Sequence, residues 1–296
     1  MQIKLTKALI SIICLSSMLL ATQYPADFLN INLDVRTAAL ADVSASYNYS
    51  LSSVFNNPAN VVGVVGMEFG STKWLADLGG NSVAICYSLG GIKARLGLGL
   101  GYAFVSTKFQ DVITQKDIKY SDNLISAVVG YRFFDKIRLG LAIKNYIQQL
   151  DEKSNTALAV DIGGSFVTKK VVLGMVAKNF GTQLSETKEE LPLKIDFGAK
   201  FVLVGSQEDR QKINLFIENS VLKQITVYKI AVEYIYQNIL SIRLGYKFNT
   251  DVEKLTFGVG TKVKIPKINL KSELNLSYIP YGSLGEVVKF SIGVKF

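Results

Sequence analysis

Apolar and polar residues alternate one by one along most of this chain, from about Val65 to the C-terminus, in stretches separated by turn residues. Successive side chains of a β-strand point to opposite faces, so the pattern predicts strands with one apolar and one polar face. A strand buried on both faces would be apolar throughout, and one face must therefore meet a wet environment. The clearest apolar sets are Leu240, Ile242, Leu244, Tyr246 and Phe248, then Leu255, Phe257, Val259 and Val263, and finally Phe290, Ile292, Val294 and Phe296.

The length and number of these stretches predict a membrane-spanning barrel. They run for about 9 to 13 residues, whereas soluble strands usually have about 5 or 6 and a tilted membrane strand needs about 9 to 11. Hydrophobic residues make up 49% of the 296 residues, yet past the N-terminus no apolar run reaches the roughly 18 residues of a membrane helix. We therefore expect an all-β fold, a transmembrane antiparallel β-barrel of about 14 strands over residues 65–296.

The connections between the stretches give an independent check. In a barrel with both ends in the periplasm, every second connection is a short periplasmic turn. The short turn pairs Gly90-Gly91, Asp135-Lys136, Lys169-Lys170, Gln237-Asn238 and Pro266-Lys267 all fall on that parity. The longest connections, near residues 108–119 and 181–190, fall on the other parity, and 205–210 is a longer exception on the periplasmic side.

Basic residues occupy the polar face of the predicted strands. Turning one toward lipid near the bilayer midplane costs roughly 2 to 4 kcal/mol, and a one-residue slip would exchange the two faces of a strand. We therefore predict a lumen lined by Arg95, Lys194, Lys200, Arg243, Lys247, Lys254, Lys262, Lys271 and Lys289. Acids on the same face are expected to pair with some of them, namely Asp161, Asp196, Glu218, Glu233 and Glu273.

Residues 1–21 have the pattern of an export signal. Lys4 and Lys7 precede an apolar core and Ala21 is a small residue suited to cleavage. Cys14 raises the alternative of a lipoprotein, against which the bulky Ile13 and the continuing apolar core argue, and a short buried helix is a further alternative. With the signal removed only Cys86 remains, so no internal disulfide is expected.

Residues 22–64 differ from the rest of the chain, with many small residues followed by Asn57, Pro58 and Ala59. Asn before Pro favours an extended turn, and the asparagine side chain can form hydrogen bonds with nearby backbone groups. We expect a small plug inside or beneath the barrel, with a plain surface loop as the alternative. Gly97, Gly99 and Gly101 alternate with leucines and fit the inward face of a strand that leaves room for the plug, since no helix follows them as a phosphate loop requires.

The last strand has the pattern of an assembly signal. Phe290, Ile292, Val294 and the terminal Phe296 stand at two-residue spacing. An edge strand ending in an aromatic ring offers both backbone and a ring to barrel assembly machinery. The alternative is an ordinary final strand.

The chain has no histidine, which removes Ser-His triads, zinc sites of the His-Glu-x-x-His type and histidine proton shuttles. A hydrolase using carboxylates alone stays open in principle, but no paired acids share a motif. We therefore expect no enzyme, no catalytic residues, no metal and no cofactor. The net charge is +9, but the basic residues fall singly on strands, so no nucleic-acid partner is expected.

The segment from Phe28 to Asp77 resembles the N-terminal region of the PorV/PorQ family, which is similar to FadL-type long-chain fatty acid transporters. The resemblance rests on Phe28-Leu29, the small-residue run 35–45, the element at Asn57, Pro58 and Ala59, and Trp74, Leu75 and Asp77 before the second strand. It implies a 14-stranded barrel. The glycine-rich run and the Asp-Asp element of the family are absent here, which leaves any plug-specific function open.

These observations give a leading hypothesis of a plugged, FadL-like protein of the outer membrane, embedded in its lipid and inserted by the barrel assembly machinery. It would transport hydrophobic or amphipathic small molecules, and a cationic lumen suits a fatty-acid-like ligand with an acidic head. The alternatives are a PorV-like interaction protein of type IX secretion, bound to secretion-system proteins, and a structural barrel without cargo.

Overall fold

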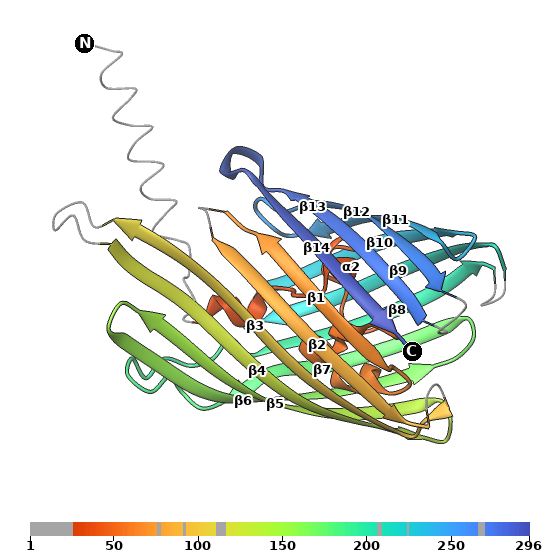
Figure 1. The fold of residues 1–296 in the computed structure, drawn as a ribbon, viewed down its shortest axis with the longest axis horizontal. Helices are drawn as coiled ribbons and strands as arrows, with labels where there is room; N and C mark the ends of the chain where they lie inside the picture. Colours follow the sequence, from red (N-terminus) through yellow and green to blue (C-terminus); the bar gives the residue numbers. More distant parts are fainter. Residues whose placement is uncertain are drawn as a thin grey trace, which may run out of the picture.

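The computed structural model describes residues 26–75, 78–90, 93–110, 117–205, 209–223, 225–265 and 270–296. The predicted signal peptide, residues 1–21, lies outside this part of the chain. In the described part, each strand pairs antiparallel with its neighbours in sequence, and β1 pairs with β14 to close a barrel of fourteen strands (Figure 1). The strands are β1 (Gly66–Lys73), β2 (Gly79–Leu89), β3 (Leu96–Gln110), β4 (Asp117–Phe133), β5 (Ile137–Leu150), β6 (Lys153–Val167), β7 (Val171–Gly181), β8 (Lys194–Val204), β9 (Gln211–Leu222), β10 (Ile225–Tyr236), β11 (Leu240–Phe248), β12 (Leu255–Ile265), β13 (Leu270–Pro280) and β14 (Glu286–Lys295).

The predicted alternation and its register are confirmed. In β11, Ile242 is 50% exposed on the outer face, whereas its neighbour Arg243 is 2% exposed on the inner face. The same alternation of buried and exposed residues runs through β4 and β13. Because large apolar side chains cover the outside, the barrel presents a surface suited to lipid. No helix of the described residues is long and apolar enough to cross a bilayer.

Strand lengths vary more than the sequence suggested, from 8 residues in β1 to 17 in β4. The end of the barrel where β1 begins and β14 ends is called the proximal end, and the opposite end the distal end. The predicted short turns at 135–136, 169–170 and 237–238 all lie at the proximal end. The distal end also has short connections that the sequence did not predict, between β5 and β6 and between β9 and β10.

Residues 26–64, called the plug, lie inside the barrel, so the alternative of a surface loop is wrong (Figure 1). The plug contains four short helical turns, η1 (Asp27–Asn30), α2 (Val35–Ala38), η2 (Leu51–Phe55) and η3 (Pro58–Val61). Asp34 caps α2, and the Asn57 side chain caps η3 by accepting a hydrogen bond from the Ala59 N–H. Pro58 occupies the first position of η3, where its missing N–H costs nothing.

Glycines on the inner face of the wall make room for the plug, as predicted for β3. A Cβ on Gly97 would lie 2.8 Å from the Cα of Val62, and a Cβ on Gly101 would lie 2.6 Å from the Phe55 ring. The same holds at Gly140 of β5, where a Cβ would overlap the backbone of Pro58 and Ala59. The plug therefore touches the backbone of the wall itself.

We predict that Gly140→Val loosens the plug, because its side chain would overlap the plug backbone. Overpacking of this kind costs about 1–3 kcal/mol. In detergent, the variant should show faster proteolysis of residues 26–64 and a lower unfolding temperature than the parent protein.

Gly79→Val is the matched control, since a Cβ there meets nothing within 4 Å. Equal protease resistance of the two variants would contradict the close contact between plug and wall.

Candidate functional site

The candidate functional site is the boundary between the plug and the barrel wall, which buried charges join at several points. Arg36 of α2 is 2% exposed and binds carboxylates from the wall. Its Nη1 lies 2.7 Å from Glu273 of β13 and its Nη2 lies 2.9 Å from Glu68 of β1. The Nη2 atom also donates to the Ser50 hydroxyl at 2.6 Å. One arginine thus ties α2 to two strands.

A second joint lies at Glu218 of β9. Its carboxylate accepts hydrogen bonds from the backbone N–H groups of Ser44 at 2.9 Å and Ala45 at 2.8 Å. Lys229 of β10 lies 2.9 Å from the same carboxylate and also donates to the Asp42 carbonyl at 2.8 Å. The plug backbone is therefore held by a paired carboxylate and ammonium of the wall.

Asp42 of the plug forms a third joint, with Lys247 of β11. Burial acts to raise the pKa of the Asp42 carboxyl, but the charges of Lys247 and Lys229 outweigh burial and hold this pKa well below its usual range. Lys247 also lies 2.9 Å from Glu253. The carboxylate of Asp42 stays ionised at physiological pH, so this joint keeps its charge.

The Asn57, Pro58 and Ala59 element fixes the plug against β5 and β6. The Asn57 amide donates to the Ala45 carbonyl at 2.8 Å. On the wall side, Gly140 and Gly163 leave the space that Asn57 and Pro58 fill. The element therefore acts as a structural wedge between two parts of the plug and the wall.

Apolar side chains gather between plug and wall toward the distal end. Phe28 of η1 stacks on Tyr146 of β5 with ring centroids 6.5 Å apart. The Tyr146 hydroxyl lies 2.8 Å from the buried Asp122 carboxylate of β4. This distal apolar cluster also contains Leu29, Leu33, Leu124, Leu184 and Leu191.

A small void lies beside this cluster. This enclosed void of about 10 Å³ lies between plug and wall, lined in part by Asn30, Asp42 and Ser44 together with Lys178 of β7 and Lys194 of β8. Such a volume holds about one water molecule. In this conformation it has no room for a larger solute.

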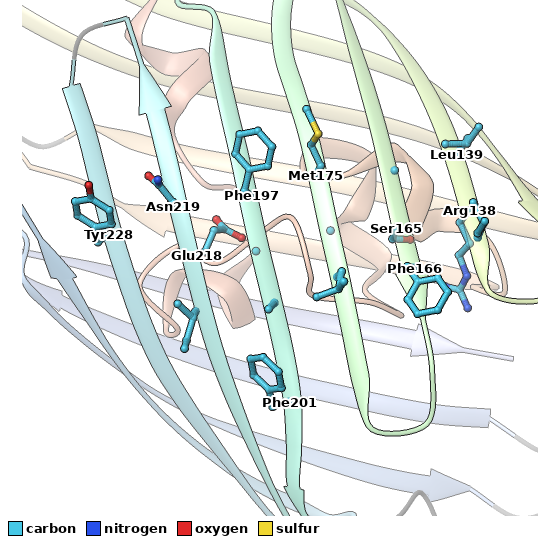
Figure 2. A pocket seen from close by; sticks show the side chains of 17 residues that line it. Arg138, Leu139, Ser165, Phe166, Met175, Phe197, Phe201, Glu218, Asn219 and Tyr228 are labelled. Carbon is cyan, nitrogen blue, oxygen red and sulfur yellow. The ribbon is translucent and has the colours of Figure 1, made fainter.

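A larger hollow lies across strands β5 to β10 and has a volume of about 830 Å³ (Figure 2). Gly164 of β6 and Ala199 of β8 belong to its lining and add little bulk on the outer face. Larger lining side chains that are exposed on the outside of the barrel are Leu139, Phe166, Leu173, Met175, Phe197 and Ile217. We call it the outer groove. Its size is within the range of small-molecule pockets.

The predicted lumen cations divide into two groups. Those within the barrel are Lys194, Lys200, Arg243, Lys247, Lys262 and Lys289. Several pair with the predicted acids: Arg243 lies 2.9 Å from Glu233, and Lys262 lies 3.4 Å from Glu273. Lys200 lies over the Phe216 ring at 5.7 Å.

Arg95, Lys254 and Lys271 do not line the lumen, which corrects the prediction for them. All three are exposed. Arg95 and Lys254 each stand just before the first residue of a strand, and Lys271 is the second residue of β13 at the proximal rim. For Arg95 and Lys254, the alternation of the sequence continues past the end of the strand, where it no longer decides which way a side chain points. Lys271 shares the parity of the inward Glu273, but it lies at the rim, where solvent reaches its side chain.

The remaining motifs lie at the barrel ends. Trp74, after β1, packs against Tyr281 with ring centroids 6.1 Å apart, and Leu75 joins the same cluster. The Lys289 ammonium lies 4.8 Å from the Trp74 ring centre. Asp77 lies outside the described residues.

The predicted assembly strand is β14. Phe290 and Ile292 point outward, and the exposed Phe296 follows the strand, its N–H donating to the Val65 carbonyl at 3.1 Å. Its role in assembly stays a prediction.

The sequence missed several charged residues of the boundary, among them Lys144, Lys178 and Lys229. Strand alternation could have found these three, since each occupies an inward position of its strand. Arg36 had no such signal, because the plug has no strand periodicity. Among the described residues, no group of acids and cysteines is arranged to hold a metal ion.

No protein-family model matches the sequence, and no curated protein matches it. The fold is similar to that of the toluene transporter TbuX of Ralstonia pickettii, with a TM-score of 0.58, 13% identity and coverage of 89% of this chain and 98% of that one. It is also similar to that of the toluene transporter TodX of Pseudomonas putida, with a TM-score of 0.57, 13% identity and coverage of 88% of this chain and 96% of that one. For a Pseudomonas aeruginosa FadL homologue the TM-score is 0.55 and the identity 10%, with coverage of 89% of this chain and 98% of that one. The chain thus has a FadL-like barrel fold.

We predict that Arg36→Met releases the plug, because it leaves the buried carboxylates of Asp34 and Glu68 without their cation and removes the contact between α2 and Glu273. Removing one partner of a buried ion pair costs about 3–5 kcal/mol. Hydrogen exchange of the plug amides should accelerate while the strand amides stay protected.

Lys254→Met, which removes an exposed cation, serves as the control and should leave exchange unchanged. Unaltered exchange in the Arg36 variant would rule out this joint as an anchor.

Proposed function

We propose that this protein carries hydrophobic or amphipathic small molecules across the outer membrane of a double-membraned bacterium. One observation carries the proposal: the barrel is filled by a plug from its own N-terminal segment, on a fold similar to two toluene transporters and a FadL homologue. A filled lumen is unsuited to free diffusion of water-soluble solutes. It suits a carrier that admits a ligand between plug and wall.

Two apolar surfaces support the ligand class. The distal apolar cluster lies between plug and wall. An apolar molecule that enters from the distal end would meet the rings of Phe28 and Tyr146 there. The outer groove offers a second apolar surface on the lipid side. Both favour molecules that gain from leaving water.

The proposed location follows from the same architecture. An outward apolar surface requires lipid, and closed barrels are the β-structures that span membranes. The signal at 1–21 would direct export, and the strand ending at Phe296 would engage the assembly machinery. No catalytic role is proposed.

A second candidate is a PorV-like role as an interaction protein of type IX secretion. The observation that favours it is the apolar surface at the distal rim, where Trp74 packs on Tyr281 and Leu284 is exposed. Such a surface fits a protein partner. Co-purification with large secretion proteins would support this role, and isolation of the protein always alone would count against it.

For the transport role, we predict faster uptake of labelled toluene and long-chain fatty acid by Gram-negative cells that carry the protein in their outer membrane and lack their own channel for these compounds. Uptake should saturate with concentration. In planar bilayers the same protein should conduct ions poorly, because the plug fills the lumen.

Cells with the empty vector are the control for uptake, and a disaccharide is the control solute. Uptake rates equal to those of the vector control would exclude transport. If no protein partner were found either, the remaining interpretation would be a structural barrel without cargo.

A further inference from the structure

Arg138 of β5 is a buried cation whose charge no acid neutralises within the described residues. Its side chain lies on the inner face at 2% exposure. The Nη2 atom donates to the Tyr49 hydroxyl at 3.0 Å, and the guanidinium lies 4.9 Å from the centre of the Tyr49 ring. The Nε and Nη1 atoms meet no acceptor in the described part of the chain.

This arrangement differs from that of the other buried arginines. Arg243 lies 2.9 Å from Glu233, and Arg36 contacts carboxylates of Glu68 and Glu273. A guanidinium taken out of water without a counter-charge is strongly unfavourable. The fold keeps Arg138 buried in spite of this cost, which indicates that an anion completes the site.

The neighbours of Arg138 also provide donors. Ser165 of β6 stands directly opposite Arg138 in the strand register, and its buried hydroxyl has no partner in the described residues. On the other side, Arg132 of β4 stands opposite Arg138 and donates to the Ala94 carbonyl. Arg138 and Ser165, on adjacent strands, therefore supply a positive charge and the hydrogen-bond donors Nε, Nη1 and Oγ, which have no partner in the described residues.

The site is formed jointly by plug and wall. Arg138 and Ser165 lie on neighbouring strands (Figure 2). They occupy the inward positions next to Gly140 and Gly163, where the Asn57 and Pro58 wedge sits, and they lie on its proximal side. Tyr49 belongs to the plug. An anion bound here would therefore contact both sides of the boundary.

We propose that Arg138, Ser165 and Tyr49 form a binding site for the carboxylate of an amphipathic acid, on the proximal side of the plug. An arginine with a hydroxyl donor matches the planar acceptor oxygens of a carboxylate. That this acid is a transported ligand rests on the proposed function. The anion site itself stands on the geometry alone.

The test is equilibrium binding of labelled octanoate and octanol to the purified full-length protein in a non-ionic detergent. Octanoate should bind at least about tenfold more tightly than octanol, as expected for a hydrogen bond to a charged group. Arg138→Met should abolish this preference, Arg138→Lys should keep part of it, and Ser165→Ala should weaken it.

Lys271→Met is the matched control, because it removes an exposed cation at the same barrel end, and it should keep the preference. Arg138→Met removes an unneutralised charge and should retain the heat-modifiable gel mobility of a folded barrel. Octanoate binding by Arg138→Met at the parent affinity overturns the inference.

A third arm identifies the source of the carboxylate. If acetate, at the same concentration as octanoate, displaces octanoate completely, the site binds a small free anion and the amphipathic ligand is overturned. If acetate does not displace octanoate, the amphipathic ligand is supported. Because this assay measures no transport, tight octanoate binding without cellular uptake would sink only the proposed function. Uptake without an octanoate preference would sink only this inference.

Discussion

The pairing of β1 with β14 closes the sheet, and closure fixes the direction of every side chain in the wall. An open sheet could place a lysine at an edge or slip by one residue, but a closed barrel in lipid has no edge at which backbone groups could stay unpaired. Polar residues at alternate positions must then point inward. Arg243, Lys247 and Lys229 are buried for this reason, and each needs a partner where water is scarce. The chemistry of the interior follows from this demand.

The plug supplies some of the partners that these buried charges need. Its backbone N–H groups at Ser44 and Ala45 bind Glu218, and its Asp42 binds Lys247. In return, Glu68 and Glu273 of the wall neutralise Arg36 of the plug. Glycines bring the two backbones close enough for these short contacts. A path for a ligand could therefore open in two ways, by breaking buried ion pairs between plug and wall or by moving apolar contacts alone. The distal apolar cluster is the region where apolar contacts dominate the boundary.

Alternation along the chain was sufficient to predict the strands, their register, the outward apolar surface and the acids that pair with lysines, because lipid on one side leaves little freedom. The glycines of β3 were also predictable, since a small residue on an inward face implies a close neighbour. The same rule was wrong for Arg95 and Lys254, which lie beyond the strand ends, and for Lys271 at the rim of β13, because solvent reaches the side chains there. Nothing in the sequence indicated the contacts of Arg36, whose partners lie on strands far along the chain.

A basic net charge suggested a lumen attractive to acidic ligands, but the buried pairs change that argument. Lys144, Lys178, Lys194, Lys229, Arg243 and Lys247 each have an acid of the barrel or plug within reach. A paired cation exerts a weak field on a third group, because its carboxylate offsets it at short range. Preference for an acidic ligand must then come from a cation without such a carboxylate. Arg138 meets this condition, and its place beside the Asn57 and Pro58 wedge puts charge recognition at the plug boundary instead of along the whole lumen.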